Sequence, residues 1–197
     1  MKTAETSVPV HPLLADRWSP RGFDRAHSLA PDQLAALLEA ARWAPSANNS
    51  QPWRFLVAQR GAPEFDRLTA ALAPGNRAWA DAASALLLVA AETVDETGRP
   101  RPWALYDTGQ AVAHLITQAQ ADGLATHQMG GFDAAAVRDD FGLAEALSPV
   151  VVIAVGRLDG DAALPEPLAA RERAPRTRAP LRSLLLTPAQ NTELPAA

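Results

Sequence analysis

Two arginines and a serine stand close together near the N-terminus, in the run Arg17-Trp18-Ser19-Pro20-Arg21. Arginine side chains match the oxygens of a phosphate group in bidentate geometry, and a serine hydroxyl adds an uncharged donor. These residue types therefore suit the binding of a phosphorylated ligand. By itself, however, so short a run is better explained as a solvated charged loop.

A second run of small and amide side chains occupies residues 44–53, between an apolar helical pattern and an apolar strand pattern. Its sequence is APSANNSQPW, with a proline near each end. Ser, Asn and Gln supply donors and acceptors without charge, which suits the polyol chain and the polar ring edge of a flavin. An ordinary turn uses the same residue types. The length of the polar run, and Trp53 at the start of the strand, favour a ligand-binding role.

The elements that must position these residues follow from the hydrophobic pattern and from capping residues. The expected helices are residues 31–43, 64–73, 103–122 and 133–142, the second ending at Pro74-Gly75. The expected strands are residues 53–59 and 150–156, while residues 82–91 are either a buried strand or a short buried helix. Helices and strands are mixed without a regular β-α-β series, which favours an α+β fold. Because no G-x-G-x-x-G follows a strand, a Rossmann nucleotide site is not expected.

The composition is that of one globular domain, with 48% hydrophobic residues in a chain of 197 and a formal net charge of −4. An acidic chain gains little from the electrostatics that dominate nucleic-acid binding, so no nucleic-acid partner is expected. There is no cysteine, which excludes thiolate nucleophiles and iron–sulfur clusters. The four histidines, at positions 11, 27, 114 and 127, form no recognisable metal pair, so no metal site is expected.

The first twenty residues contain no apolar core of signal-peptide length, and the longest apolar run, residues 85–91, is too short to span a membrane. A cytoplasmic protein with no membrane partner is therefore expected. We divide the chain into a flexible N-terminal arm at residues 1–12, one ligand-binding domain at residues 13–186, and a C-terminal tail at residues 187–197.

Several aromatic and apolar side chains have an expected place. Trp43, Trp53 and Trp103 are expected in the core, and Leu105 on the buried face of the helix at residues 103–122. The core is also favoured for Trp79 and Tyr106, although both could line a pocket. His114 is expected to be a packed or interface residue, and His127 a possible pocket residue.

Taken together, these motifs resemble the FMN-dependent nitroreductase family. Residues 44–55 are similar to its APSxxNxQPWxF signature, and residues 17–21 to its R-x-S-x-R/K phosphate motif. Three further stretches resemble segments of the same family. Residues 75–82 resemble its N-x-x-W-x-x-D-A segment, and residues 123–133 resemble its G-L…G-G-F-D segment. Residues 176–181 resemble its R-x-R-x-P-L segment. The pieces occur in family order and cover about residues 13 to 186.

The resemblance implies a central, mostly antiparallel sheet flanked by helices in an intertwined homodimer. The C-terminal segment of each subunit would extend over the other, and FMN would be bound at the interface. In this arrangement Arg17 and Ser19 contact the phosphate and ribityl chain, and Arg21 lies nearer the pyrimidine edge. Arg178, with Arg176, closes on the phosphate from the tail.

The remaining residues that the resemblance implies surround the ring. From the opposite subunit come Pro45, Ser46, Ala47 and Asn49. Asn76 bonds the pyrimidine ring, and Gly130 brings a backbone N–H near N5, with Gly131 beside it. The expected cofactor-binding set is completed by Trp18, Gln51 and Met129. No catalytic side chain is expected, because the reactive centre is N5 of FMN.

The implied activity is a ping-pong oxidoreduction in which NADH or NADPH gives a hydride to FMN. A small-molecule acceptor, namely a nitroaromatic, a quinone or an activated alkene, then takes the electrons. Two alternatives remain open, namely a member that dehydrogenates or dehalogenates its substrate, and a flavin-binding protein without turnover. The segment at residues 92–101 is short, where larger relatives insert helices over the pocket. The acceptor site is therefore expected either to be more open or to be completed by other residues.

Overall fold

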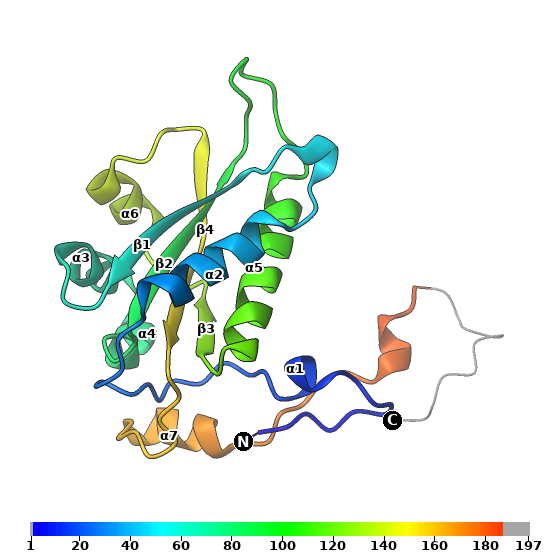
Figure 1. Ribbon diagram of the computed structural model, residues 1–197, viewed down its shortest axis with the longest axis vertical. Coiled ribbons are helices and arrows are strands. Elements are labelled where there is room, and N and C mark those ends of the chain that lie inside the picture. The colour runs from blue at the N-terminus through cyan, green and yellow to red at the C-terminus, as the bar shows by residue number, and fades with distance from the viewer. Residues whose placement is uncertain (1, 187–197) are drawn as a thin grey trace.

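The computed structural model describes residues 2–186, and its centre is a four-stranded sheet of order β1-β2-β4-β3 (Figure 1). The strands are β1 (Trp53–Gln59), β2 (Ala85–Glu92), β3 (Ala125–Met129) and β4 (Leu147–Gly156). Every neighbouring pair is antiparallel, which confirms the expected α+β fold. Central β2 is apolar at nearly every position, as a strand buried on both faces requires, so the choice left open for residues 82–91 is settled as a strand.

Strand β4 is longer than expected, because it passes through a proline. Val89 of β2 faces Val151, and the next residue, Ala90, faces Pro149, so one residue of β4 has no partner at this point. Such an extra residue is a β-bulge, one of the few places within a sheet where proline is tolerated. The strand therefore begins at Leu147, and not at residue 150.

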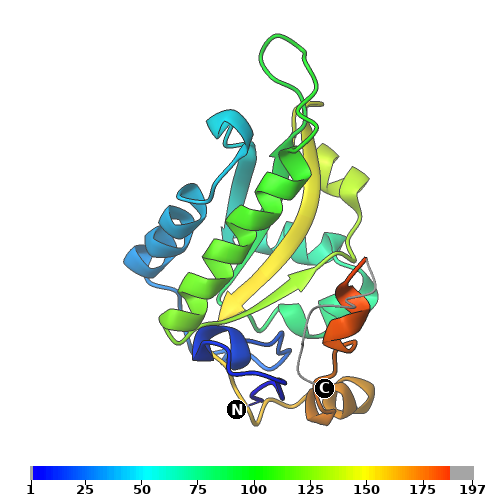
Figure 2. The same ribbon diagram turned by 90° about the vertical axis from the view of Figure 1, so that its right-hand side faces the viewer.

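Helices cover both faces of the sheet. On one face lie α2 (Pro31–Arg42) and the long α5 (Ala104–Ala121), and on the other lie α3 (Pro63–Ala71), α4 (Pro74–Ala80) and α6 (Ala134–Phe141) (Figures 1 and 2). Successive side chains of a strand point to opposite faces. In β2, Leu87 accordingly packs with the α2–α5 side, whereas Leu86 and Leu88 pack with the α3–α4–α6 side.

The helix ends follow the expected capping chemistry in part. The Asp133 carboxylate caps α6 by accepting hydrogen bonds from the N–H groups of Ala135 and Ala136, each at 3.0 Å. Gly142 ends that helix in the left-handed conformation, with φ of 59°. At α2 the N-cap position is Ala30, and the Gln33 side chain accepts from the Ala30 N–H instead, at 3.1 Å.

Four short elements were not expected. Pro74 begins helix α4 as well as following α3, which agrees with the preference of proline for the first helical position. Strand β3 has the mixed sequence ATHQM, and α7 (Glu166–Arg173) is highly polar, so neither shows a hydrophobic period. A single turn, α1 (Pro12–Ala15), spans the boundary placed after residue 12.

The N-terminal segment and the segment that follows α7 lie side by side, away from the sheet (Figure 1). The Ala4 N–H donates to the Ala15 carbonyl at 2.8 Å, and the Arg176 guanidinium donates to the Lys2 carbonyl at 2.8 Å. After α7 the tail continues to a 3₁₀ turn, η2 (Leu181–Leu184). The tail at residues 187–197 lies outside the described residues.

Candidate functional site

The structure brings the two arginine-bearing motifs together, although more than 150 residues separate them. Arg17, Trp18, Ser19 and Arg21 follow α1, and Arg176 and Arg178 follow α7. All six line one hollow of about 230 Å³, which we call the arginine cradle. Lys2 and Arg171 also line it, so the hollow is bordered by six basic side chains.

Hydrogen bonds to the backbone hold the tail arginines in the cradle. Arg176 donates to the carbonyls of Lys2 and Ala15, at 2.8 and 2.5 Å, and Arg178 donates to the Thr177 carbonyl at 2.8 Å. Arg17 lies 3.4 Å from the Ser19 hydroxyl. None of these contacts neutralises a charge. The guanidinium groups are therefore positioned by neutral partners and keep their positive charge for a ligand.

The cradle is electrostatically crowded. The pKa of Arg17 is lowered from its ordinary value, first by burial and then by the charges of Arg176 and Arg178. A lowered pKa in a cation means that the protein disfavours its charge at that place. An anion bound among the three guanidinium groups would reverse this effect. Arg21 differs, because it forms an ion pair with Glu172 at 2.9 Å.

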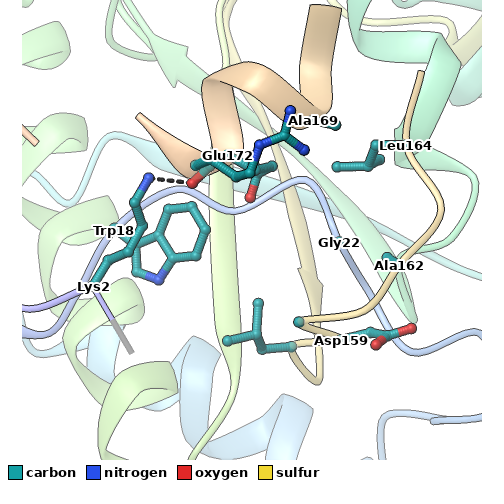
Figure 3. A pocket seen from close by; sticks show the side chains of 11 residues that line it. Lys2, Trp18, Gly22, Asp159, Ala162, Leu164, Ala169 and Glu172 are labelled. Atoms are coloured by element: carbon teal, nitrogen blue, oxygen red, sulfur yellow. Dashed lines mark hydrogen bonds between the residues drawn. The ribbon is translucent and has the colours of Figure 1, made fainter. Parts of the chain in front are cut away.

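A second cavity of about 320 Å³ adjoins the cradle and shares Lys2 and Trp18 with it (Figure 3). Figure 3 shows Lys2 beside the Trp18 indole and bonded to Glu172. The Lys2 ammonium lies 4.7 Å from the indole ring centre, a cation–π contact, and donates to the Glu172 carbonyl. Glu172 thus connects α7 to both Lys2 and Arg21, which fixes one wall of the cradle.

A glycine turn follows β3 and is bonded to α4. The Gly131 carbonyl accepts from the Asn76 side-chain amide and from the Ala73 N–H, both at 3.0 Å. A Cβ on Gly131 would lie 3.1 Å from that amide nitrogen and 3.3 Å from the Ala73 Cβ, so close packing explains this glycine. A Cβ on Gly130 would meet nothing within 4 Å. Packing within one chain therefore does not explain Gly130.

Met129 is placed differently from the other expected contacts. Its side chain is 2% exposed and packs in the core on the α3–α4–α6 side. A ligand at this edge of the sheet would therefore meet Gly130 and Gly131, which are exposed, and not the Met129 side chain.

The amide-rich loop at residues 44–53 has an unusual backbone. Asn48, Asn49 and Gln51 have positive φ values of 52°, 55° and 45°. Asparagine visits this left-handed region more readily than most residues, whereas glutamine rarely does. Such strained positions persist only when the surroundings impose them, and they cluster at ligand sites. Gln51 in particular, which is not a usual residue for this conformation, therefore marks the loop as a candidate ligand site.

Three hydrogen bonds impose this conformation. The Ser46 hydroxyl accepts from the Gln51 N–H at 3.0 Å, the buried Asp107 carboxylate accepts from the Ala47 N–H at 3.0 Å, and Arg101 donates to the Ser50 carbonyl at 2.8 Å. Arg101 and Asp107 were not among the expected site residues. Both are distant in sequence from the loop, and neither belongs to a recognisable motif.

Large aromatic side chains near this loop are exposed, which corrects the expectation of a buried position. Trp43, Trp103 and Tyr106 are 71%, 61% and 67% exposed, and Leu105 is 57% exposed. Trp53 and Trp79 are buried, as expected. Trp103 and Tyr106, together with Pro45, Ser46 and Ala47, line a hollow of about 270 Å³. His114 is exposed on the same helix.

Within one chain, the loop and the cradle lie at opposite ends of α5. The loop is bonded to Asp107, in the first turn of α5. At the other end, Trp18 of the cradle lines a hollow together with Gln120 and Gly123. At the usual rise per residue, the 18 residues of α5 span about 27 Å. Within one chain, the two groups of residues therefore lie far apart, at opposite ends of this helix.

His127 lies beneath the cradle and is buried, with 9% of its surface exposed. Its Nδ1 is 2.8 Å from the Pro20 carbonyl oxygen, and its ring centre is 4.5 Å from that of Trp79. Burial is the main reason why the pKa of His127 is lowered to about 4, and the charges of Arg21 and Arg17 act in the same direction. His127 is therefore neutral at pH 7. It packs in the interior and does not line the cradle.

Two further searches cover only the part of the chain that the structure describes. Residues 2–186 contain no group of His, Cys, Asp and Glu side chains arranged to hold a metal ion. Within the same residues, no helix has both the length and the apolar character needed to cross a membrane.

Comparisons with known proteins agree with this geometry. The family model described as "Nitroreductase family" matches residues 14–157. The chain is 36% identical to the "Uncharacterized 15.4 kDa protein in ask 5'region" of Mycolicibacterium smegmatis, over 68% of this chain and 95% of that protein. It is 28% identical to the "Putative NAD(P)H nitroreductase YdgI" of Bacillus subtilis, over 74% of this chain and 86% of that protein.

Solved structures give a similar result. A crystal structure described as an oxidoreductase containing FMN superimposes with a TM-score of 0.87 at 34% identity, and the match covers 95% of this chain and 96% of the other. A second, described as a putative nitroreductase in complex with FMN from Desulfovibrio desulfuricans, has a TM-score of 0.73 at 26% identity, and covers 91% and 98% of the two chains.

Proposed function

The chain belongs to the nitroreductase family, and we propose on this premise that it is an FMN-dependent NAD(P)H oxidoreductase that binds its flavin between two copies of the chain. The relatives support the coarse activity, since they include an "NAD(P)H nitroreductase" by name and a structure described as containing FMN. The two-chain site rests on the geometry of α5 described above.

The separation of the cradle from the amide-rich loop is the observation that carries this proposal. Both have the chemistry of a flavin mononucleotide site, since one offers cations to a phosphate and the other offers amides and a hydroxyl to a polyol and a ring edge. The residues of α5 that adjoin them, Asp107 and Gln120, are 13 positions apart, or about 20 Å at the usual rise per residue. In a dimer with two-fold symmetry, the loop of each copy would lie at the cradle of the other copy. The dimer would therefore contain two equivalent sites.

Exposed apolar surface supports the second copy. Trp43, Trp103, Leu105 and Tyr106 lie on or next to α2 and α5, and Leu184 and Leu185 lie in the tail. Large apolar side chains gathered in this way mark protein–protein contacts. Aromatic residues are also enriched in such interfaces. The tail leucines would then lie over the partner chain.

In the proposed site, Arg17, Ser19, Arg176 and Arg178 hold the phosphate. Arg21, already paired with Glu172, lies toward the pyrimidine edge, and Trp18 forms the wall beside it. Asn76, Gly130 and Gly131 meet the ring from α4 and the end of β3, with Met129 packing beneath them. From the second copy come Pro45, Ser46, Ala47, Asn49 and Gln51.

When bound, FMN supplies the hydride transfer, and the chain supplies position and electrostatics. The exposed N–H of Gly130 would donate toward N5, and the arginines would balance the charge of the phosphate. Donor and acceptor would use one open pocket in turn, which is a ping-pong scheme. A planar acceptor such as a nitroaromatic, a quinone or an activated alkene would suit a pocket next to Trp103 and Tyr106.

The absorption spectrum and mass of the purified protein test this proposal. We expect a flavin spectrum, bleaching on addition of NADH or NADPH, recovery of colour with a quinone or nitro compound, and a mass of two chains. A colourless monomer that ignores added FMN would contradict the proposal as a whole. Bound flavin that no nicotinamide reduces would contradict the activity and favour a binding protein without turnover.

A further inference from the structure

We infer that His127 is a positioning residue, which holds the arginine cradle in place through its hydrogen bond to Pro20. The inference rests on the proposed function, since the cradle is the proposed phosphate site. Pro20 stands between Ser19 and Arg21, and the His127 Nδ1 is 2.8 Å from its carbonyl oxygen. Both Pro20 and His127 are buried. The bond therefore joins strand β3 to the segment that carries four cradle residues, Arg17, Trp18, Ser19 and Arg21.

Three aromatic rings in contact with one another extend this connection. Phe23 and Trp79 have ring centres 6.0 Å apart with planes at 14°, and Trp79 lies 4.5 Å from His127 at 40°. Each ring belongs to a segment with a proposed flavin contact. Phe23 is two residues after Arg21, Trp79 is three residues after Asn76, and His127 is three residues before Gly130. The column thus fixes three separate segments relative to one another.

The hydrogen bond has a defined direction. A carbonyl oxygen only accepts, so Nδ1 must carry the hydrogen and Nε2 must be bare in the neutral ring. The charged groups that face the ring are Arg17 and Arg21, both of which disfavour a proton on it. The two arginines therefore favour the neutral ring, and the Pro20 carbonyl selects the tautomer with its hydrogen on Nδ1.

The ring contact with Trp79 alone does not explain why residue 127 is a histidine. Phenylalanine would keep the ring contact with Trp79 but would leave the Pro20 carbonyl without this donor. Asparagine would lose the ring, but its side-chain amide nitrogen can take the place of Nδ1 as a donor. The two substitutions His127→Phe and His127→Asn therefore separate packing from hydrogen bonding. Thr126→Val is a matched control, because Thr126 is a buried neighbour on the same strand and alternate strand residues face opposite ways.

The test is FMN affinity, measured by flavin fluorescence titration of the stripped protein, together with hydrogen exchange of residues 16–24 without FMN. Loss of one hydrogen bond to a buried carbonyl should weaken FMN binding by about tenfold in His127→Phe. Exchange in residues 16–24 should also become faster in that variant. His127→Asn should stay within about threefold of the unaltered chain, and Thr126→Val should match it in both measurements. Circular dichroism confirms that each variant is folded.

Two results would overturn the inference. One is a folded His127→Phe variant with unchanged FMN affinity and unchanged exchange in residues 16–24. The other is a His127→Asn variant that loses as much as His127→Phe, because the ring and not the bond would then be responsible. If the unaltered chain does not bind FMN, the proposed function fails. The exchange comparison of the three variants then still decides whether His127 holds the segment.

Discussion

Arg17 has unfavourable electrostatic surroundings in the flavin-free protein. It is half-buried, its guanidinium is near those of Arg176 and Arg178, and the structure gives it a hydroxyl and no carboxylate as its hydrogen-bond partner. A structural role alone would favour a carboxylate at this place, as Glu172 provides for Arg21. Arg17 is better explained by a ligand that brings the negative charge.

Replacement of Arg17 by alanine should weaken FMN binding by roughly 10- to 150-fold, the effect of losing one charge-assisted contact of about 1.5–3 kcal/mol. The thermal midpoint of the flavin-free protein should be unchanged or slightly raised, because charge repulsion in the cradle is reduced. Fluorescence titration and a melting curve measure the two effects. Arg173→Ala is the control, since Arg173 is paired with Glu166 and does not line the cradle. Equal FMN affinity in the two variants would argue against the assignment.

His127 gives the protein a predictable response to acid. Its pKa is about 4 in the folded chain and 6.5 ordinarily, so between these values the unfolded chain binds more protons. The contribution of His127 to the free energy of unfolding is therefore fully present above pH 6.5, and it is lost as the pH falls toward 4. The difference between the two pKa values corresponds to at most about 3 kcal/mol in the free energy of unfolding. Urea unfolding at pH 7 and pH 4.5 measures how much stability is lost in acid. The free energy of unfolding should fall less in His127→Asn than in the unaltered chain. An equal fall in both proteins would contradict this account.

At the element scale, the turn after β3 contains two neighbouring glycines that the structure distinguishes. Gly131→Ala should lower the free energy of unfolding by about 1–3 kcal/mol, because its Cβ crowds Asn76 and Ala73. Gly130→Ala meets no atom within 4 Å and should leave stability nearly unchanged. If the Gly130 backbone approaches the flavin, however, this second variant should lose FMN affinity. A Gly130→Ala protein with normal flavin binding and reduction would remove Gly130 from the site.

The elements that could be predicted from sequence are those whose own residues carry the signal. The helix at α2 and the strand at β1 were expected within one residue of their ends, because periodicity and flanking prolines mark both. Strand β3 carries His127 and Gln128 and has no alternating pattern. Its existence depends on pairing with β4, a contact between segments far apart in the chain.

The same distinction between local signals and distant contacts applies to the candidate site. Its contiguous motifs could be located from residue types, and the structure gathers the two arginine motifs into one hollow. The residues that hold those motifs, Arg101, Asp107 and His127, act across 51, 60 and 107 positions of sequence, and no local pattern reveals such contacts. Trp43 and Trp103 were expected in the core because large aromatic residues are usually buried, and the sequence pattern does not reveal that these two are exposed.

For the molecule as a whole, the proposed two-chain site can be tested by mixing two defective variants. A cradle-defective chain, Arg17→Ala with Arg178→Ala, and a loop-defective chain, Asp107→Ala, should each bind FMN poorly. After denaturation and joint refolding, half of the dimers would be mixed, and each mixed dimer would regain one intact site, so about a quarter of all sites should bind FMN. Titration with FMN measures the recovered fraction. No recovery from a mixture that forms dimers would place the site within one chain.

The uninterrupted helix α5 has a consequence beyond the packing of one subunit. Because the cradle and the loop are attached near its two ends, the number of turns in α5 would set the spacing of the two flavin sites in the proposed dimer. Insertion of one turn would displace the two halves of each site by about 5.4 Å at once, while an isolated subunit could still fold around the longer rod. Selection for paired active sites would therefore restrict the length of this helix more strictly than folding does, so indels in related chains should be found in the loops that flank it.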